Sequence, residues 1–199
     1  MSMKKHRLIA LFSLATAIAN ADEKSYVEIG TGWARLSEDC PSFETCDLNS
    51  PSYRIGIGSD VTDWLGGSIT YADLGKYHAR TTAPVNNVSI FGNSSLSAFM
   101  LQATVFKKTG NVMVYGKLGA AYGSVKGNVT AINMTTGKTG YLSLSEHSTS
   151  PAFSIGASIE ATSMISFAAQ FDHLVNVGGG DNTEKVDVDM IGISARLGF

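Results

Sequence analysis

Apolar side chains occupy every second position in eight separate stretches of this chain. In the last stretch, Ile191 to Phe199, alternate residues counted back from Phe199 are apolar, and the residues between them are small or polar. Alternation with a period of two is typical of a β-strand with one apolar and one polar face. The pattern therefore predicts eight strands, at residues 25–35, 52–59, 64–75, 97–107, 112–123, 152–161, 165–173 and 191–199.

The segments between these strands alternate in length. Three of them are tight turns, at residues 60–63, 107–111 and 162–164. The other four are long and rich in Ser, Thr, Asn and Gly, at 36–52, 74–94, 124–150 and 175–186. Short turns on one side and long loops on the other are typical of a transmembrane β-barrel with periplasmic turns and extracellular loops. Segment 124–150 also alternates in part, which indicates a hairpin that extends the barrel above the membrane.

The chemistry of the two strand faces favours a closed barrel. In lipid every backbone N–H and C=O group must be paired, so a sheet can span a membrane only if it closes on itself. Strands of about ten residues, tilted near 40°, cover the hydrocarbon thickness. We therefore expect an all-β fold, an up-and-down antiparallel barrel of eight strands. Its apolar face meets lipid, and its small and polar face fills a narrow interior.

Composition and charge agree with this interpretation. Only 16% of the 199 residues are charged, and 21 are glycine. In soluble proteins roughly a quarter of all residues are charged. The net charge is −2 and the basic residues are scattered, so we expect no nucleic-acid partner. After the first twenty positions the chain has no apolar run of the roughly 20 residues that a membrane helix requires.

The N-terminus has the pattern of a secretory signal peptide. A basic start at residues 4–7 precedes a short apolar stretch, residues 8–19, and then the small residues Ala19, Asn20 and Ala21. We expect residues 1–21 to be the signal peptide and residues 22–199 to be the barrel domain. The alternative is an uncleaved anchor helix, which the shortness of the apolar stretch disfavours.

The two cysteines of the chain, Cys40 and Cys46, lie in the first long connector. In an exported protein such a pair is most simply a disulfide that closes a small loop. Their spacing is not that of a zinc site, and no histidine lies nearby. We expect neither a metal nor a cofactor.

Five charged residues fall on the inward faces of the predicted strands: Glu28, Arg54, Lys117, Glu160 and Arg196. Isolated charges in so narrow a space are costly, so we expect them to pair. The first choices are Glu28 with Arg196 and Lys117 with Glu160, with Arg54 competing for Glu28. The network is either a polar plug or gate, or a means of satisfying a wet interior, and the narrow bore favours the latter. Other polar residues on the inward faces are Gln102, Gln170 and Asp172.

The last residue, Phe199, ends the closing strand on its predicted lipid face. This resembles the signal that the barrel assembly machinery of Gram-negative bacteria reads, although Ser194 stands where that signal commonly has glycine, with Gly192 two residues earlier. We also expect aromatic residues to form girdles at the membrane interfaces. The candidates are Tyr26, Trp33, Tyr53, Tyr71, Phe99, Tyr122 and Phe153.

A second stretch, "VTDWLGGSITYADLGKY" at residues 61–77, is similar to the second hairpin of the OmpA-like eight-stranded barrel family. The resemblance implies a barrel in the outer membrane of a Gram-negative bacterium, with surface-exposed loops. Larger members of that family add a periplasmic peptidoglycan-binding domain. Because this chain ends with the barrel, we expect that activity to be absent.

Three classes of function fit this barrel. The first is a non-enzymatic surface protein that presents its loops for envelope integrity, adhesion or host interaction. Its partners would be outer-membrane lipid and lipopolysaccharide, the barrel assembly machinery and host surface ligands, and we expect a monomer. The second is a small gated channel for ions or small solutes.

The third class is an enzyme that modifies lipid A. Such an enzyme needs a nucleophile, a base and an orienting acid near the outer leaflet. The stretch "SEHSTS" offers Glu146, His147, Ser148 and Ser150. The deacylase signature His-x-Ser-Asn is missing there, so we expect no enzymatic activity.

Overall fold

The computed structural model of the chain describes residues 25–37, 44–83, 88–178 and 185–199. The predicted signal peptide lies outside the described residues. No helix among them is long and apolar enough to cross a membrane. The described strands are β1 (Ser25–Ser37), β2 (Thr45–Asp47), β3 (Asn49–Asp60), β4 (Leu65–Ala83), β5 (Val88–Thr109), β6 (Val112–Asn133), β7 (Thr139–Glu160), β8 (Ile165–Gly178) and β9 (Lys185–Gly198).

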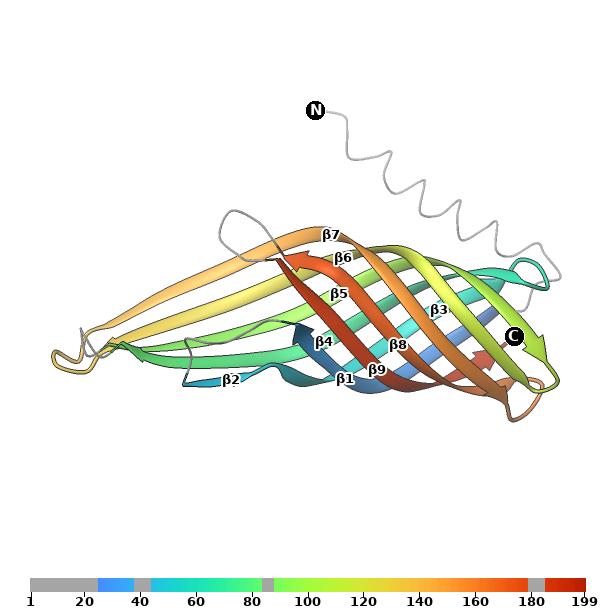
Figure 1. Cartoon of the computed structure of the whole chain (residues 1–199), viewed down its shortest axis with the longest axis horizontal. Coiled ribbons are helices and arrows are strands. Elements are labelled where there is room, and N and C mark those ends of the chain that lie inside the picture. The colour runs from blue at the N-terminus through green and yellow to red at the C-terminus, as the bar shows by residue number, and fades with distance from the viewer. Residues whose placement is uncertain (1–24, 38–43, 84–87, 179–184) are drawn as a thin grey trace, which may run out of the picture.

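The eight long strands close into a ring in which every neighbouring pair is antiparallel. The order is β4-β3-β1-β9-β8-β7-β6-β5, and β5 pairs again with β4. The first and last strands meet in register, with Tyr26 opposite Gly198. Figure 1 shows the strands tilted across the long axis of the molecule. The predicted fold class, an antiparallel eight-stranded barrel, is confirmed.

Threonine side chains stabilise two of the tight turns in the same way. Thr62 Oγ1 accepts the backbone N–H groups of Trp64 and Leu65 at 3.3 and 3.0 Å. Thr162 Oγ1 accepts those of Met164 and Ile165 at the same two distances. Such side-chain bonds satisfy the backbone where the strand ladder ends. The turns β3–β4 and β7–β8 are therefore short because a local residue closes each of them.

Strands β4 to β7 are much longer than the ten residues that the alternation predicted. They contain 19, 22, 22 and 22 residues and continue as a paired sheet at the left of Figure 1, beyond the other strands. The predicted hairpin within 124–150 is confirmed, whereas most of 74–94, expected as a loop, is strand. These segments consist largely of Ser, Thr, Asn and Gly, and neighbouring strands supply the pairing that their composition does not predict.

A β-bulge reverses the faces of β4 where it leaves the barrel. Asp73 lies opposite Ser97, but Gly75 lies opposite Leu96, so Leu74 is an extra residue. Gly75 has a φ of +91°, and a Cβ atom there would lie 2.1 Å from Ser50 Oγ, so only glycine fits. Because a one-residue insertion exchanges the two faces, the residues after the bulge point opposite to the barrel pattern.

The outward face of the barrel is apolar. Trp33 and Ile193, for example, are 68% and 66% exposed, as expected of side chains that contact lipid. Tyr71, Phe99 and Tyr122 lie side by side across β4, β5 and β6 and form an aromatic row. The girdle assignment of Tyr26 was wrong, because its ring lies inside the barrel against the backbone of Gly58. Tyr26 has the same strand parity as Glu28, so alternation itself places it inward.

The interior has two layers. The periplasmic half contains the charged residues described below. The extracellular half is filled by an apolar cluster, which we call the upper core, with Leu74, Leu174, Val188 and Met190 among its most buried members. These residues lie at the outer ends of the strands, beyond or near the predicted strand limits. The interior is therefore less polar than the alternation within the predicted strands indicated.

Candidate functional site

The candidate site is the filled bore of the barrel and the sheet that projects from it. At the periplasmic end, Arg196 Nε donates a hydrogen bond to Glu28 Oε2 at 2.8 Å, and both side chains are buried. These residues lie directly opposite each other on β9 and β1. The guanidinium also lies 5.0 and 4.6 Å from the ring centroids of Tyr26 and Tyr115, a cation–π arrangement on two rings.

A second ion pair crosses the bore. Arg54 Nη2 on β3 lies 2.8 Å from Asp172 Oδ2 on β8, with side chains 2% and 0% exposed. Asp172 Oδ1 also accepts the Ser154 hydroxyl at 2.6 Å and a hydrogen bond from Gln170 Nε2. Arg54 was expected to compete for Glu28. It pairs instead with Asp172 across the interior.

Glycines on the inward face provide the room for these long side chains. A Cβ atom on Gly192 would lie 3.3 Å from Arg54 Nη2, and one on Gly156 would lie 2.6 Å from the Tyr115 ring. Tyr115 Oη in turn donates to Gln170 Oε1 at 2.9 Å. The high glycine content therefore follows from packing a few large polar groups into a narrow bore.

The expected pairing of Lys117 with Glu160 is wrong. Glu160 lies at the periplasmic rim, partly exposed, where its Oε1 is 2.5 Å from Lys108 Nζ. Lys117 is buried, with Nζ 5.4 Å from the centroid of the Tyr115 ring. In the β6–β7 register Lys117 lies opposite Ser154, six residues from Glu160, which is about 20 Å along the strand. Alternation assigns a face but not a height, so it could not exclude this pair.

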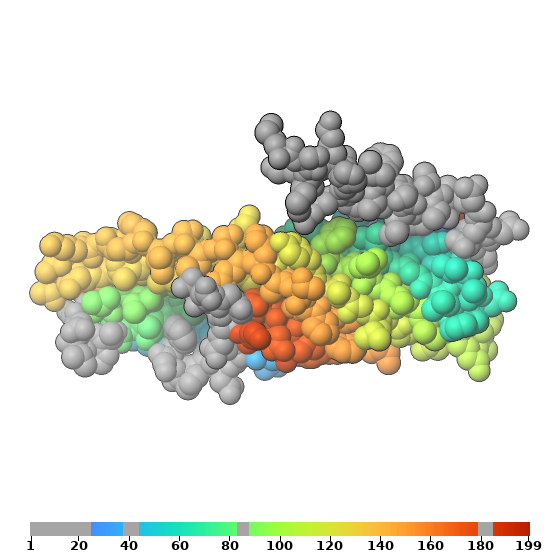
Figure 2. All heavy atoms as spheres, turned by 90° about the horizontal axis from the view of Figure 1, so that it is seen from above, coloured from blue at the N-terminus to red at the C-terminus, as the bar shows by residue number. Residues whose placement is uncertain are grey.

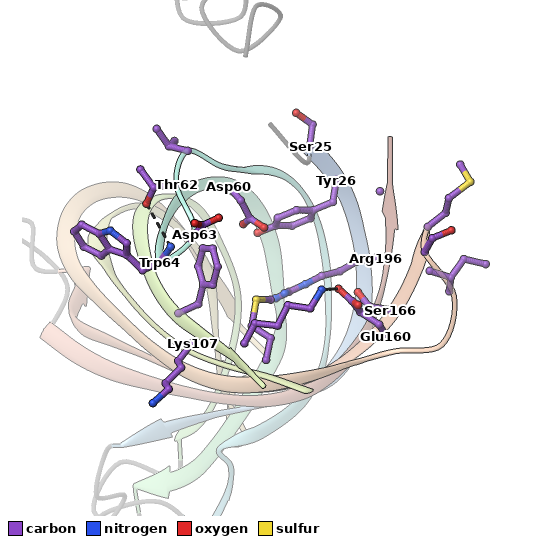
Figure 3. Close-up of a pocket in the computed structure, with 18 of the residues that line it drawn as sticks. Ser25, Tyr26, Asp60, Thr62, Asp63, Trp64, Lys107, Glu160, Ser166 and Arg196 are labelled. Carbon is purple, nitrogen blue, oxygen red and sulfur yellow. Dashed lines mark hydrogen bonds and ion pairs between the residues drawn. The ribbon is translucent and has the colours of Figure 1, made fainter. Parts of the chain in front are cut away.

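A cavity of about 620 Å³ opens at the periplasmic mouth of the barrel. Figure 3 shows Tyr26 and Arg196 reaching across this mouth, with Glu160 beside them and Trp64 and Lys107 on the rim. Further in, the two ion pairs and then the upper core occupy the bore. The mouth is therefore the blind end of a filled barrel.

The remaining predicted site residues lie apart from this network. Cys46 on β2 is disulfide-bonded, and its proposed partner Cys40 lies outside the described residues. Phe199 donates its backbone N–H to Ser25 O at 2.9 Å, while its ring is 74% exposed at the periplasmic end. Within the part of the chain that the structure describes, no group of acidic, histidine or cysteine residues could hold a metal ion.

The stretch considered for lipid A chemistry is part of strand β7. Because successive strand residues face opposite sides, His147 and Ser148 point to different faces of the sheet. The His147 ring stacks on Tyr122, with centroids 5.6 Å apart. Ser148 Oγ accepts the backbone N–H of Gly178 at 2.8 Å, and Ser150 Oγ donates to Asn176 O at 3.0 Å. These contacts do not bring a base and a nucleophile together.

A closed ring of antiparallel strands with an apolar outer face and a polar, filled interior defines a transmembrane β-barrel of the outer membrane. The family model of the outer membrane protein beta-barrel domain matches residues 8–199. The chain belongs to this family, and its location is the outer membrane. A comparison with curated protein sequences finds no match.

Solved barrels with low sequence identity share the fold. Ail, the attachment invasion locus protein of Yersinia pestis, has a TM-score of 0.56 and 18% identity, covering 90% of this chain and 100% of Ail. Neisserial surface protein A has a TM-score of 0.52 and 16% identity, covering 88% and 97%. A major outer membrane protein of Thermus thermophilus has 0.53 and 13%, covering 90% and 100%.

Proposed function

We propose that this protein is a non-enzymatic surface protein that binds partners outside the cell through its projecting sheet. The observation that carries the proposal is the length of β6 and β7 beyond the aromatic row. From Tyr122 to the end of β6 at Asn133 the strand continues for eleven residues, or about 35 Å. Figure 2 shows the β6–β7 hairpin, coloured yellow to orange, extending past the rest of the molecule.

The outer edge of β7 supports protein binding in particular. Residues 139–151 pair with β6, whereas the pairing of β7 with β8 begins only at Ala152. At the other side of the same sheet, β2 covers the edge of β4 between His78 and Arg80. Edge strands are commonly protected by lysine or proline, and the edge at 139–151 contains no lysine and has its one proline, Pro151, at the end next to the barrel. Such an edge can add a strand of a partner through backbone hydrogen bonds.

The similar structures are compatible with adhesion. Ail is named as an attachment and invasion protein, and one of its crystal structures contains the heparin analogue sucrose octasulfate. A host protein or a sulfated glycan is therefore the partner class that we propose for the projecting sheet.

A hairpin truncation tests this function. Lys126 and Ser145 are direct partners in the β6–β7 register, so residues 127–144 can be replaced by Asn-Gly, a two-residue hairpin turn. We expect this variant to keep the folded, heat-modifiable form and to lose adhesion to host-cell monolayers. The control replaces only residues 133–138 by Asn-Gly, which retains the paired sheet and should retain adhesion. If the variant that lacks residues 127–144 adhered as well as the control, the projecting sheet would not be the binding surface.

The two alternative functions have less support. The ion pairs and the upper core that occupy the bore argue against a channel. The opposite orientations of His147 and Ser148 argue against a lipid A deacylase. Mass spectrometry of lipid A from expressing cells tests the second point, and a lost acyl chain would overturn the non-enzymatic assignment.

We also propose that Phe199 is read by the barrel assembly machinery and that the folded protein is a monomer. The ring of Phe199 is exposed, and only its backbone N–H is bonded to β1. Phe199→Ala should therefore refold in vitro like the wild type but reach the outer membrane in reduced amount, as measured by membrane fractionation. An unchanged membrane level would remove Phe199 as the signal.

A further inference from the structure

Beyond the aromatic row, the outward face of β4–β6 carries two exposed lysines at the same level. Lys76 on β4 and Lys126 on β6 lie on either side of Ser95 on β5 and in direct register with it. With strands about 4.8 Å apart, their Cα atoms are about 10 Å apart. Both lysines are exposed, and neither has a carboxylate partner among the described residues. We call Lys76, Ser95 and Lys126 the basic row.

The basic row lies at the level of the lipid headgroups. Lys126 follows Tyr122 by four residues on the same face of β6, which is about 13 Å along the strand. With a strand tilt near 40°, the height above the tyrosine ring is about 10 Å. Since interfacial aromatic rings lie at the membrane–water boundary, the lysines stand where the headgroups of outer-leaflet lipids lie.

A cavity of about 640 Å³ extends from the level of the aromatic row to the level of the basic row. Its base is formed by Tyr53 and Tyr71, and Lys76 and Lys126 line its upper part. Two carboxylates also line it, and each accepts a backbone N–H group two residues further along the chain. Asp73 Oδ1 accepts that of Gly75 at 2.9 Å, and Asp47 Oδ1 accepts that of Asn49 at 3.2 Å. Hydroxyl groups come from Ser95 in the basic row and from Ser97 and Ser124 below it.

The β-bulge at Gly75 creates this arrangement. Without the extra residue, strand alternation would turn Lys76 to the inner face, because the bulge exchanges the two faces of β4. On the other side of the barrel, the outer part of β9 carries Asp187 and Asp189, with Lys185 beyond them at the start of the strand. Over β4–β6, by contrast, the bulge places two lysines at the same level on either side of Ser95.

We propose that this cavity binds the phosphorylated sugar headgroup of a glycolipid of the outer leaflet. The ammonium groups of Lys76 and Lys126 contact its phosphates, because lysine commonly binds phosphate as a point charge. The serine hydroxyls contact the sugar, and the acyl chains continue down the apolar face past Tyr71. The occupant is a lipid and not a soluble anion, because the cavity opens directly onto the surface that contacts the bilayer.

The test measures binding of purified diphosphoryl lipid A to the full-length mature protein by native mass spectrometry in detergent. Lys76→Gln/Lys126→Gln should weaken apparent affinity about tenfold, the effect of losing two partly exposed charge contacts. The matched control, Lys138→Gln/Lys185→Gln, removes the same charge from exposed extracellular positions outside the cavity and should bind within about twofold of wild type. Lys76→Arg/Lys126→Arg keeps the charge and should also bind.

The lipid chemistry is varied in the same experiment. Monophosphoryl lipid A should bind more weakly than the diphosphoryl form, and pyrophosphate at the same phosphate concentration should not displace either lipid. Equal binding of both lipids to all variants would show that acyl chains alone determine the affinity and would overturn the proposal. Full displacement by pyrophosphate would identify a site for soluble anions and would overturn it as well.

Discussion

Arg54 and Asp172 come from strands that are three places apart in the ring, and their contact spans the bore. Both charges are removed from water, so each depends on the other, and Asp172 also accepts hydrogen bonds from Ser154 and Gln170. Removal of one partner from a buried pair is far more costly than loss of an exposed pair. The periplasmic half of the interior should therefore be sensitive to single substitutions.

Asp172→Ala tests this dependence. The change leaves Arg54 buried without its carboxylate, and we expect the free energy of unfolding to fall by about 3–5 kcal/mol. Lys108→Ala, which breaks the partly exposed pair with Glu160, is the control and should cost about 0–1 kcal/mol. Urea unfolding of protein refolded into lipid vesicles measures both. Similar losses for the two variants would contradict the assignment.

Individual contacts differed in how far the sequence could predict them. Glu28 and Arg196 could be paired in advance, because closure of the barrel makes the first and last strands neighbours and both residues lie near the same end. Arg54 with Asp172 could not, because a contact across the bore depends on the stagger of the strands. Lys117 with Glu160 failed for a different reason, because these residues lie on neighbouring strands but six residues apart along them.

At the scale of the element, β4 shows how one extra residue determines which side chains of a strand point outward. The bulge at Leu74 and Gly75 turns Tyr77 inward, where it is 3% exposed and its hydroxyl donates to Leu74 O at 2.7 Å. The same bulge turns Lys76 and His78 outward. An alternation that is read without the bulge assigns all of these residues to the wrong face.

Gly75→Ala should destabilise the barrel by about 1–3 kcal/mol, because a side chain at this positive φ is strained and its Cβ atom would collide with Ser50. The control is Gly92→Ala on β5, where the nearest atom to a new Cβ is 3.8 Å away, and a change within about 0.5 kcal/mol is expected. Denaturant midpoints in vesicles provide the comparison. An equal shift for both glycines would exclude a special role for the bulge.

At the scale of the whole molecule, side chains block the interior of the barrel at two levels. The ion pairs close the periplasmic half, and the upper core closes the extracellular half with Leu74, Leu174 and Met190. A side-chain-filled interior of this kind is expected for eight strands. The projecting sheet and the basic row are both outside this plug, so the proposed functions do not require an open lumen.

Planar-bilayer recordings should therefore show no stepwise conductance for the wild type. Arg54→Ala should behave in the same way, because the upper core still separates the two mouths after the ion pair is lost. A porin recorded in the same bilayers is the positive control. A conductance that appears or rises with Arg54→Ala would show that the polar layer alone forms the barrier.

The sequence by itself determined the class of fold, the number of long strands, the lipid-facing side and the positions of the tight turns. It could do so because a period of two and local turn residues are properties of short segments. Only the tertiary structure decided the length of β4–β7, the reversal at Gly75, the pairing across the bore and the apolar upper core. Each of these depends on which strand lies beside which and at what stagger, and no local pattern carries that information.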